Sequence, residues 1–172
     1  LSPTGKASYT LSNYIGEQAM TIHRGLGYNP KEGWLYGENP KSEYVNKLPY
    51  DLIIVDEFSM IDIFLMRQLL SAINTERTKI LFVGDDGQLA SVSCGNCANN
   101  MIQSKVIPVS RLTKVFRYQD GGLAKVAMNI YNGNKYFDRL ESKITSFGIN
   151  KDYILIKTNQ EEQTKSILSV YK

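Results

Sequence analysis

Two adjacent carboxylates end a strongly apolar segment near the middle of the chain. The segment "DLIIVDE" (51–57) places Asp56 and Glu57 directly after four apolar residues. A short β-branched apolar run is typical of a buried parallel strand. At the end of such a strand Asp56 could hold Mg²⁺, directly or through water, and Glu57 could orient or deprotonate an attacking water. The same pattern also fits a strand that ends in two solvated carboxylates.

A glutamine follows a second strand of the same kind. The segment "KILFVGD" (79–85) ends in Asp85, and Gln88 lies three residues further on in a glycine-containing turn. A glutamine at this place could hydrogen-bond a γ-phosphate or its attacking water, although turn chemistry alone also explains it. Because ligands bind beyond the carboxyl ends of parallel strands, we expect both strand ends to belong to one site.

A basic stretch contains one arginine of interest. Arg117 follows Phe116 in "RLTKVFRYQD" (111–120). An arginine that reaches a γ-phosphate would neutralise charge in the transition state. The alternative is an exposed arginine with no catalytic role.

The first eight residues, "LSPTGKAS", resemble a phosphate-binding loop but do not fit one. In G-x-x-x-x-G-K-[ST] a hydroxyl follows the lysine, whereas Ala7 stands there. Pro3 also removes a backbone N–H that would face a phosphate. The segment therefore predicts a strand-to-helix turn, and a helix start at Thr4, Gly5 and Lys6 is an anion site.

The cysteines and the histidine indicate no second metal site. Cys94 and Cys97 form a single C-x-x-C, and His23 is the only histidine. A zinc site would need a second cysteine pair or nearby histidines. We expect two ordinary thiols and a structural histidine.

Composition and length predict one soluble globular domain. The chain has 172 residues, of which 42% are hydrophobic and 22% charged, as in ordinary globular proteins. No apolar run approaches the roughly 20 residues of a membrane span, so we expect no membrane partner. Two cysteines do not suggest a secreted disulfide scaffold, and the expected location is the cytoplasm.

The elements that must position these residues form an α/β pattern. Two buried strands joined by a helix predict a βαβ unit with a parallel sheet. Residues 25–50, rich in Gly, Pro, Asn and Tyr, predict a loop or β-hairpin. Strands are expected at 51–57, 79–85 and 152–158, and helices at 7–19, 61–73, 95–105, 123–131 and 159–172.

Five segments in order resemble the motor of a superfamily 1 helicase of the RecD-like type (the exodeoxyribonuclease V alpha-subunit type). They are "LSPTGKAS", "TIHRGLGY", "DLIIVDEFSMID", "VGDDGQLASV" and "RLTKVFRY". The resemblance implies a RecA-like P-loop NTPase core with a parallel sheet and helices on both faces, truncated at the N-terminus so that its first strand and helix are missing. Residues 1–172 would be a partial motor domain, with 25–50 a hairpin insertion and 152–172 a closing strand and helix.

The resemblance assigns DNA-contacting roles to two segments near the start of the chain. "SPTGKAS" resembles motif Ia, which touches the backbone of single-stranded DNA, and "TIHR" resembles the next DNA-facing motif. The implied contacts are Pro3, Thr4, Gly5, Lys6, Ser8, Thr21, His23 and Arg24. Trp34, in the insertion that would help part the duplex, could stack on bases, and simple packing explains it as well.

The resemblance also implies ATP and Mg²⁺ as cofactors. Asp56 would bind the metal and Glu57 would be the catalytic carboxylate. Gln88 would sense the γ-phosphate and Arg117 would be the arginine finger. The usual G-D-P-D-Q-L-P lacks both prolines here, since the segment is Gly84 to Ala90.

The family's phosphate loop and second motor domain are not among these residues. We therefore expect a part of a 5′–3′ ATP-dependent DNA helicase of recombination or repair, inactive as the 172-residue chain alone. Single-stranded DNA, duplex junctions and nuclease or recombination subunits would be partners. The alternatives are a superfamily 1 RNA helicase, a relaxase helicase domain, or a non-catalytic nucleic-acid-binding module.

Overall fold

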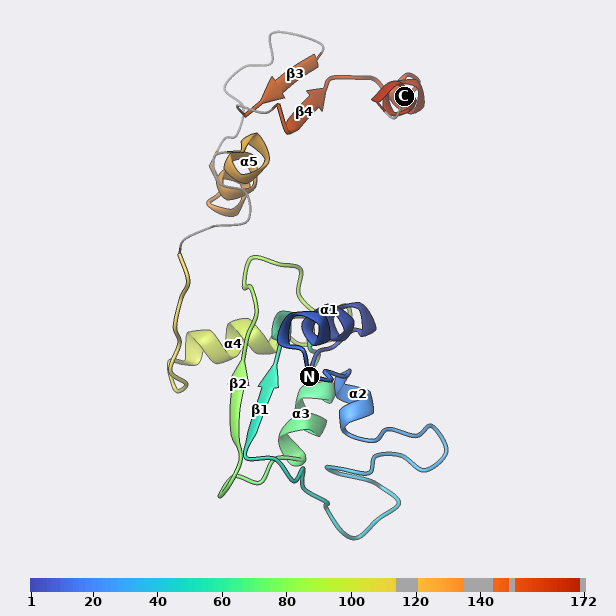
Figure 1. The fold of residues 1–172 in the computed structure, drawn as a ribbon, viewed down its shortest axis with the longest axis vertical. Coiled ribbons are helices and arrows are strands. Elements are labelled where there is room, and N and C mark those ends of the chain that lie inside the picture. Colours follow the sequence, from blue (N-terminus) through green and yellow to red (C-terminus); the bar gives the residue numbers. More distant parts are fainter. Residues whose placement is uncertain (114–120, 135–143, 149–150, 171–172) are drawn as a thin grey trace. The chain divides into compact units, whose positions relative to one another are not determined.

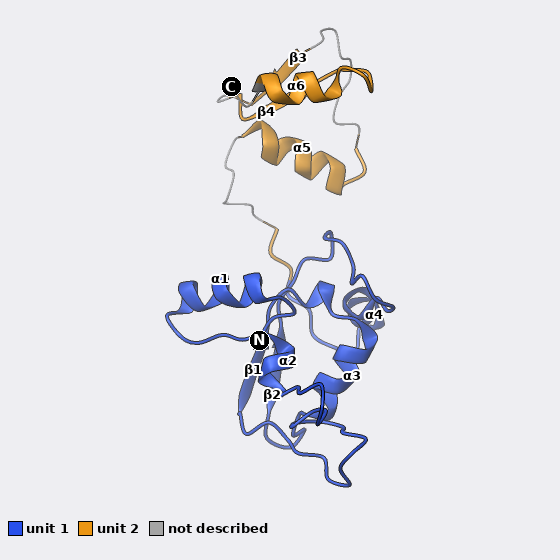
Figure 2. Ribbon diagram, turned by 90° about the vertical axis from the view of Figure 1, so that its right-hand side faces the viewer, with its two compact units in different colours: residues 1–110 blue, residues 111–172 orange. Residues whose placement is uncertain are grey.

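The chain divides into two compact units. The computed structural model describes residues 1–113, 121–134, 144–148 and 151–170. Residues 1–110 form the first unit and 111–172 the second, coloured blue and orange in Figure 2. The assignment of the whole chain to one motor domain stays a prediction. The longest helix of the described residues has 11 residues, whereas a membrane span needs about 20.

A parallel strand pair forms the centre of the first unit. Strand β1 (Leu52–Val55) pairs with β2 (Lys79–Phe82), with Ile54 opposite Leu81. Helix α3 (Ile63–Ser71) connects them (Figure 1). Asp62 caps α3, since its carboxylate accepts the Leu65 N–H at 2.8 Å. The predicted βαβ unit is confirmed, although α3 begins two residues after Ile61, which the sequence places inside the helix.

Two further segments extend this sheet in parallel. The amino group of Leu1 donates to the Ile54 carbonyl at 2.7 Å, and the Leu1 carbonyl accepts the Asp56 N–H at 2.9 Å. This is the bonding pattern of a parallel ladder. On its other side, Ser2 forms a parallel bridge with Thr21. The first two residues therefore lie between β1 and the segment at Thr21.

Two helices begin directly after these extended residues. Helix α1 (Gly5–Ile15) is capped by Thr4, and the short α2 (Ile22–Gly25) by Thr21. Each threonine hydroxyl accepts a backbone N–H of the first turn at 3.2 Å, as N-cap residues do. Helix α1 ends four residues before the predicted position 19, because Gly16 adopts the left-handed φ of 70° that ends many helices.

A long loop joins α2 to β1. Residues 26–51 contain no helix or strand of their own, and two isolated antiparallel bridges, Asn29–Gly33 and Gly37–Asn46, shape them. The core of the unit lies under this loop and α3. Its fully buried side chains include Ile22, Leu26, Val55, Ile61 and Leu69.

Two shorter helices complete the first unit. A single 3₁₀ turn, η1 (Phe58–Met60), lies between β1 and α3, and helix α4 (Cys97–Ser104) follows the segment after β2. The sequence predicts α4 at 95–105, one or two residues longer at each end.

The second unit contains an antiparallel pair. Helix α5 (Gly122–Tyr131) precedes β3 (Ile144–Phe147), and β4 (Tyr153–Ile156) precedes α6 (Gln163–Val170). Strand β4 pairs antiparallel with β3, which the sequence does not predict. Helix α6 begins four residues later than the predicted position 159. Asn159 still accepts the Glu162 N–H at 2.8 Å, as a capping residue would.

Candidate functional site

Four parallel segments end at one edge of the first unit. We call this the carboxyl edge, and it consists of the residues directly after Ser2, Thr21, Val55 and Phe82. Because the segments run in the same direction, the residues after each segment emerge on the same side. In Figure 1 the arrowheads of β1 and β2 point toward α1. The parallel order therefore gathers predicted site residues from distant parts of the chain.

Asp56 and Glu57 lie at this edge in a strained turn. Both are half-buried, and Oδ1 of Asp56 accepts the Glu57 N–H at 2.9 Å. Glu57 has a left-handed φ of 54°, a conformation that costs energy for any residue except glycine and is common at functional sites. The strain indicates that this turn is held by its surroundings.

The surroundings that hold the turn come from the segment after β2. The Phe58 N–H donates to the Val83 carbonyl at 3.1 Å. Gly84 packs so closely that a Cβ there would lie 2.7 Å from Phe58 Cδ1. The two strand ends are thus locked together just beyond the sheet.

Mg²⁺ fits the donor set of this turn. It prefers carboxylate oxygens and usually takes only one or two of them, completing its shell with water and substrate phosphates. Among the described residues no group of three or more His, Cys, Asp or Glu side chains could hold a metal ion. Asp56 could supply one such carboxylate to a Mg²⁺ ion, with water or a bound phosphate completing the shell.

Gln88 lies in an exposed turn after β2. Its N–H donates to the Asp85 carbonyl at 3.2 Å, and Oδ1 of Asp85 accepts the Gly87 N–H at 2.9 Å. Such an Asx turn shapes the backbone locally. These two bonds hold the backbone that carries Gln88.

The start of α1 presents an open backbone. Thr4 is half-buried, Gly5 and Lys6 are exposed, and a Cβ at Gly5 would meet nothing within 4 Å. Ser8 differs from the other predicted contacts in this segment. It is buried, and its hydroxyl donates to the Gly5 carbonyl at 2.9 Å, so the structure uses it within the helix.

His23 and Arg24 are exposed on α2, and His23 belongs to an aromatic cluster. Its ring stacks with Trp34 at a centroid distance of 5.4 Å and meets Tyr28 edge-on at 5.7 Å. Tyr28 and Trp34 lie 4.5 Å apart. The sequence indicates Trp34 as a residue that could stack on bases, but it does not indicate a contact with His23, eleven residues earlier.

The loop at 26–51 encloses a hollow of about 180 Å³ lined by Trp34, Tyr44 and three asparagines among other residues. All three asparagine side chains are already engaged, since Oδ1 of Asn29 accepts the Lys31 N–H at 2.8 Å. Asn39 donates to the Trp34 carbonyl at 2.8 Å, and Asn46 donates to the Leu35 carbonyl at 2.9 Å. The hollow is thus a product of the loop's own hydrogen bonds, and no residue of the carboxyl edge lines it.

The remaining candidates lie apart from this edge or outside the described residues. Arg117 falls in the range 114–120, which the structure does not describe. Cys94 and Cys97 are free thiols. Burial, with Asp62 and Cys94 nearby, raises the pKa of the Cys97 thiol, which keeps that thiol protonated and unreactive.

Comparison with known proteins places this arrangement in a family. A family model described as an AAA domain matches residues 1–145. The chain belongs to the AAA domain family. Membership implies a P-loop fold and ATP as the ligand. Of that fold, the described residues form a small parallel sheet. Within the family this chain is a partial RecD-like helicase region.

Three curated relatives of this AAA domain chain are, by name, a DNA helicase and two subunits of the RecBCD enzyme. The ATP-dependent RecD2 DNA helicase of Deinococcus radiodurans is 39% identical over 116 residues, which is 67% of this chain and 15% of that protein. The RecBCD enzyme subunit RecD of Mycolicibacterium smegmatis is 32% identical over 118 residues (59% and 20%), and that of Haemophilus influenzae 35% over 103 residues (60% and 15%). The matches thus cover 15–20% of these relatives' length.

Proposed function

We propose that this chain is the part of an ATP-dependent DNA helicase motor that grips single-stranded DNA at the starts of α1 and α2 and presents Asp56 and Glu57 to a magnesium nucleotide. One observation carries the proposal. Four parallel segments end at the carboxyl edge, which brings anion-binding helix starts and two carboxylates to one side of one unit.

The DNA-binding half of the proposal rests on exposed donors and cations. The first turn of α1 leaves N–H groups without helical partners, and the helix dipole favours an anion there. Gly5 leaves room for a backbone phosphate to approach, and the exposed Lys6 adds a positive charge. Arg24 on α2 and the Thr21 cap continue this surface along the same edge.

The nucleotide half rests on the turn after β1. Asp56 would hold Mg²⁺, which neutralises charge on the nucleotide phosphates when it is bound. Glu57 would orient the attacking water and accept its proton. Gln88 would hydrogen-bond the γ-phosphate from the turn after β2, and Arg117 would supply positive charge to the transferring phosphate.

For the whole protein we propose a helicase that moves 5′ to 3′ on single-stranded DNA in recombination or repair. The support is the printed names of the relatives, an ATP-dependent DNA helicase and subunits of the RecBCD enzyme. Duplex junctions and nuclease or recombination subunits would be its partners, at the nucleoid in the cytoplasm. The 172 residues contain no G-x-x-x-x-G-K-[ST] segment, and we expect this chain alone not to turn over ATP.

A lysine exchange tests the proposed DNA surface. Lys6→Ala in the 172-residue chain should weaken binding of a labelled 15-mer of deoxythymidine by roughly 3- to 10-fold and reduce the slope of log K against log salt by about 0.7, the value for one single-strand phosphate contact. Fluorescence anisotropy at several salt concentrations measures both.

The matched control is Lys79→Ala. Lys79 is also exposed, but it begins β2 and so lies at the opposite edge of the sheet. Its exchange should leave affinity and salt slope unchanged. Equal losses for the two lysines, or no binding by the unmodified chain, would overturn the proposed surface.

A further inference from the structure

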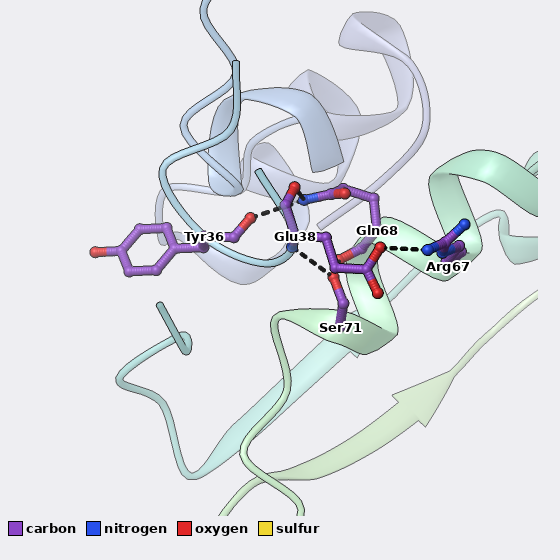
Figure 3. Close-up of polar contacts among 5 residues, drawn as sticks. All are labelled: Tyr36, Glu38, Arg67, Gln68 and Ser71. Carbon is purple, nitrogen blue, oxygen red and sulfur yellow. Dashed lines mark hydrogen bonds and ion pairs between the residues drawn. The ribbon is translucent and has the colours of Figure 1, made fainter. Parts of the chain in front are cut away.

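The loop at 26–51 is fastened to α3 by side chains that no predicted motif includes. Gln68 and Ser71 lie on α3, and Figure 3 shows both directed at the loop segment from Tyr36 to Glu38. We propose that Gln68 and Ser71 are positioning residues that hold the His23–Trp34 stack ready to bind an unpaired nucleobase. This inference rests on the proposed function, because it names a base contact of the same DNA strand.

Gln68 forms the central contact between α3 and this loop segment. It is a buried polar residue with 8% exposure, and such a residue requires hydrogen-bond partners. Its amide donates to the carbonyls of Tyr36 and Glu38, at 3.0 and 3.1 Å. One side chain thus satisfies two loop carbonyls on either side of Gly37, while the ring of Tyr36 points away from it (Figure 3).

Ser71, one helical turn further along α3, also bonds to the loop segment from Tyr36 to Glu38. Its hydroxyl accepts the Glu38 N–H at 3.0 Å and donates to the Gln68 carbonyl at 2.8 Å. It therefore joins the loop backbone to the helix backbone through one atom. The loop cannot slide along α3 without breaking these bonds.

Gly37 allows the close approach that these bonds require. A Cβ at this position would lie 2.5 Å from Gln68 Nε2 and 2.7 Å from Ser71 Oγ. Its φ of 88° is also one that side-chain-bearing residues avoid. Backbone conformation and packing both demand glycine here, which indicates a specific contact rather than a loop resting on a helix.

The fastened segment fixes the two stacked rings. The N–H groups of Leu35 and Tyr36 donate to the carbonyls of Gly27 and Leu26, at 3.3 and 3.1 Å. This short ladder ties the residues after Trp34 to the residues after α2, which carries His23. Leu26 is fully buried, so this end of the ladder is anchored in the core.

The ring stack has the chemistry for a base. Aromatic rings bind unpaired bases through their faces without regard to sequence, and a base–aromatic stack is worth roughly a 5- to 150-fold change in affinity. His23 is exposed, as is the neighbouring Arg24, which can contact the adjacent phosphate. A preformed stack also avoids the entropic cost of ordering a loop upon binding.

Trp34 is the only tryptophan of the chain, so its fluorescence reports on this loop alone. Gln68→Leu keeps a side chain of similar size but removes both donors. We expect it to raise quenching of Trp34 by acrylamide about twofold and to weaken binding of the deoxythymidine 15-mer about 5-fold or more. Trp34→Ala, followed by anisotropy of labelled DNA, should weaken binding by a similar or larger factor.

Salt dependence separates this role from a merely structural or electrostatic one. The salt slope of binding should stay unchanged in Gln68→Leu and Trp34→Ala, because no phosphate contact is lost. The matched control is Arg67→Ala on the same helix, which removes only the exposed ion pair with Glu38. It should leave quenching and affinity within about twofold of the unmodified chain.

Two outcomes would overturn this inference. One is unchanged quenching and affinity in Gln68→Leu, and the other is undiminished DNA binding by Trp34→Ala. If Lys6→Ala still weakens binding in either case, the proposed DNA surface stands and only the base contact fails. Should circular dichroism show that Gln68→Leu does not fold, Ser71→Ala takes its place with the same expected direction. It removes the hydroxyl that accepts the Glu38 N–H and donates to the Gln68 carbonyl.

Discussion

The two strand pairs of this protein are alike in size, but they differ in where the carboxyl ends of their strands lie. The β1–β2 and β3–β4 pairs each consist of two four-residue strands rich in apolar side chains. In the parallel pair both carboxyl ends emerge at one edge, whereas in the antiparallel pair they emerge at opposite edges. Side chains after the strands can therefore meet only in the first case.

The carboxylates beside the two strand pairs differ as well. Asp152 directly precedes β4, and both of its carboxylate oxygens accept hydrogen bonds from the start of α5. The donors are the N–H groups of Gly122 at 2.8 Å and Leu123 at 3.2 Å. Oδ1 of Asp56, next to β1, accepts only the N–H of its neighbour Glu57, and within the described part of the chain Oδ2 accepts no hydrogen bond. A satisfied carboxylate stabilises a fold, and an unsatisfied one is available to a ligand.

The largest expected effect tests whether the parallel pair is the stable one. Ile53 in β1 is 4% exposed and Ile154 in β4 is 49% exposed. Ile53→Ala should cost about 2–5 kcal/mol, and Ile154→Ala less than about 1 kcal/mol, because only the first leaves a cavity. Hydrogen exchange of the β1 and β4 amides measures each loss. Comparable losses at the two positions would contradict the contrast.

A smaller effect tests the strain at the carboxylate turn. Glu57→Gly should stabilise the first unit by up to about 1 kcal/mol, because glycine adopts the φ of 54° without penalty. Urea unfolding followed by Trp34 fluorescence measures it. Asp62→Gly, at a capping position of negative φ, is the control and should destabilise instead. A stability loss in Glu57→Gly would show that the carboxylate itself holds the turn.

The smallest effect concerns the satisfied carboxylate. The two backbone N–H donors of α5 lower the pKa of Asp152. A carboxyl group with a lowered pKa stabilises the folded state above its unfolded pKa of about 4, and this contribution is lost as the pH falls through the lower folded value. The protection of the amides at the start of α5, which is the intrinsic exchange rate at a given pH divided by the observed rate at that pH, should accordingly decrease on acidification.

The control for this pH dependence is Asp152→Asn. In this variant the backbone amides at the start of α5 should be less protected than in the unmodified chain at neutral pH. At low pH they should be equally protected in both, because the asparagine side chain cannot ionise. If both proteins show the same dependence between about pH 7 and pH 3, a window that brackets the carboxyl pKa, the bonds to Gly122 and Leu123 do not control this helix start.

Several features arise from local pattern and were predictable. Apolar runs that end in carboxylates predicted β1 and β2, and periodic apolar residues predicted α3. The helix start at Gly5–Lys6 and the loop after α2 were also predictable, because proline, glycine and capping residues act on their own neighbourhood. The helix ends were less accurate, since a glycine such as Gly16 ends α1 at a position that apolar spacing does not indicate.

Other features depend on contacts between distant residues. Nothing in "ITSF" (144–147) distinguishes a strand from a loop until β4 pairs with it. Ser8 carries a hydroxyl suited to a phosphate, yet helix geometry turns it to the Gly5 carbonyl. Gln68 looks like an ordinary surface residue of an amphipathic helix, and only the packing of the loop reveals its two acceptors.

The sequence by itself determined which groups are present and the approximate positions of β1, β2 and most of the helices, because capping, turn formation and apolar spacing act within a few residues. Only the tertiary structure decided which of them meet. Leu1 and Ser2 lie between β1 and Thr21 through long-range backbone bonds, and that parallel order puts Lys6, Arg24 and Asp56 at one edge. Such an order depends on pairing between residues far apart in the chain, which no local pattern specifies.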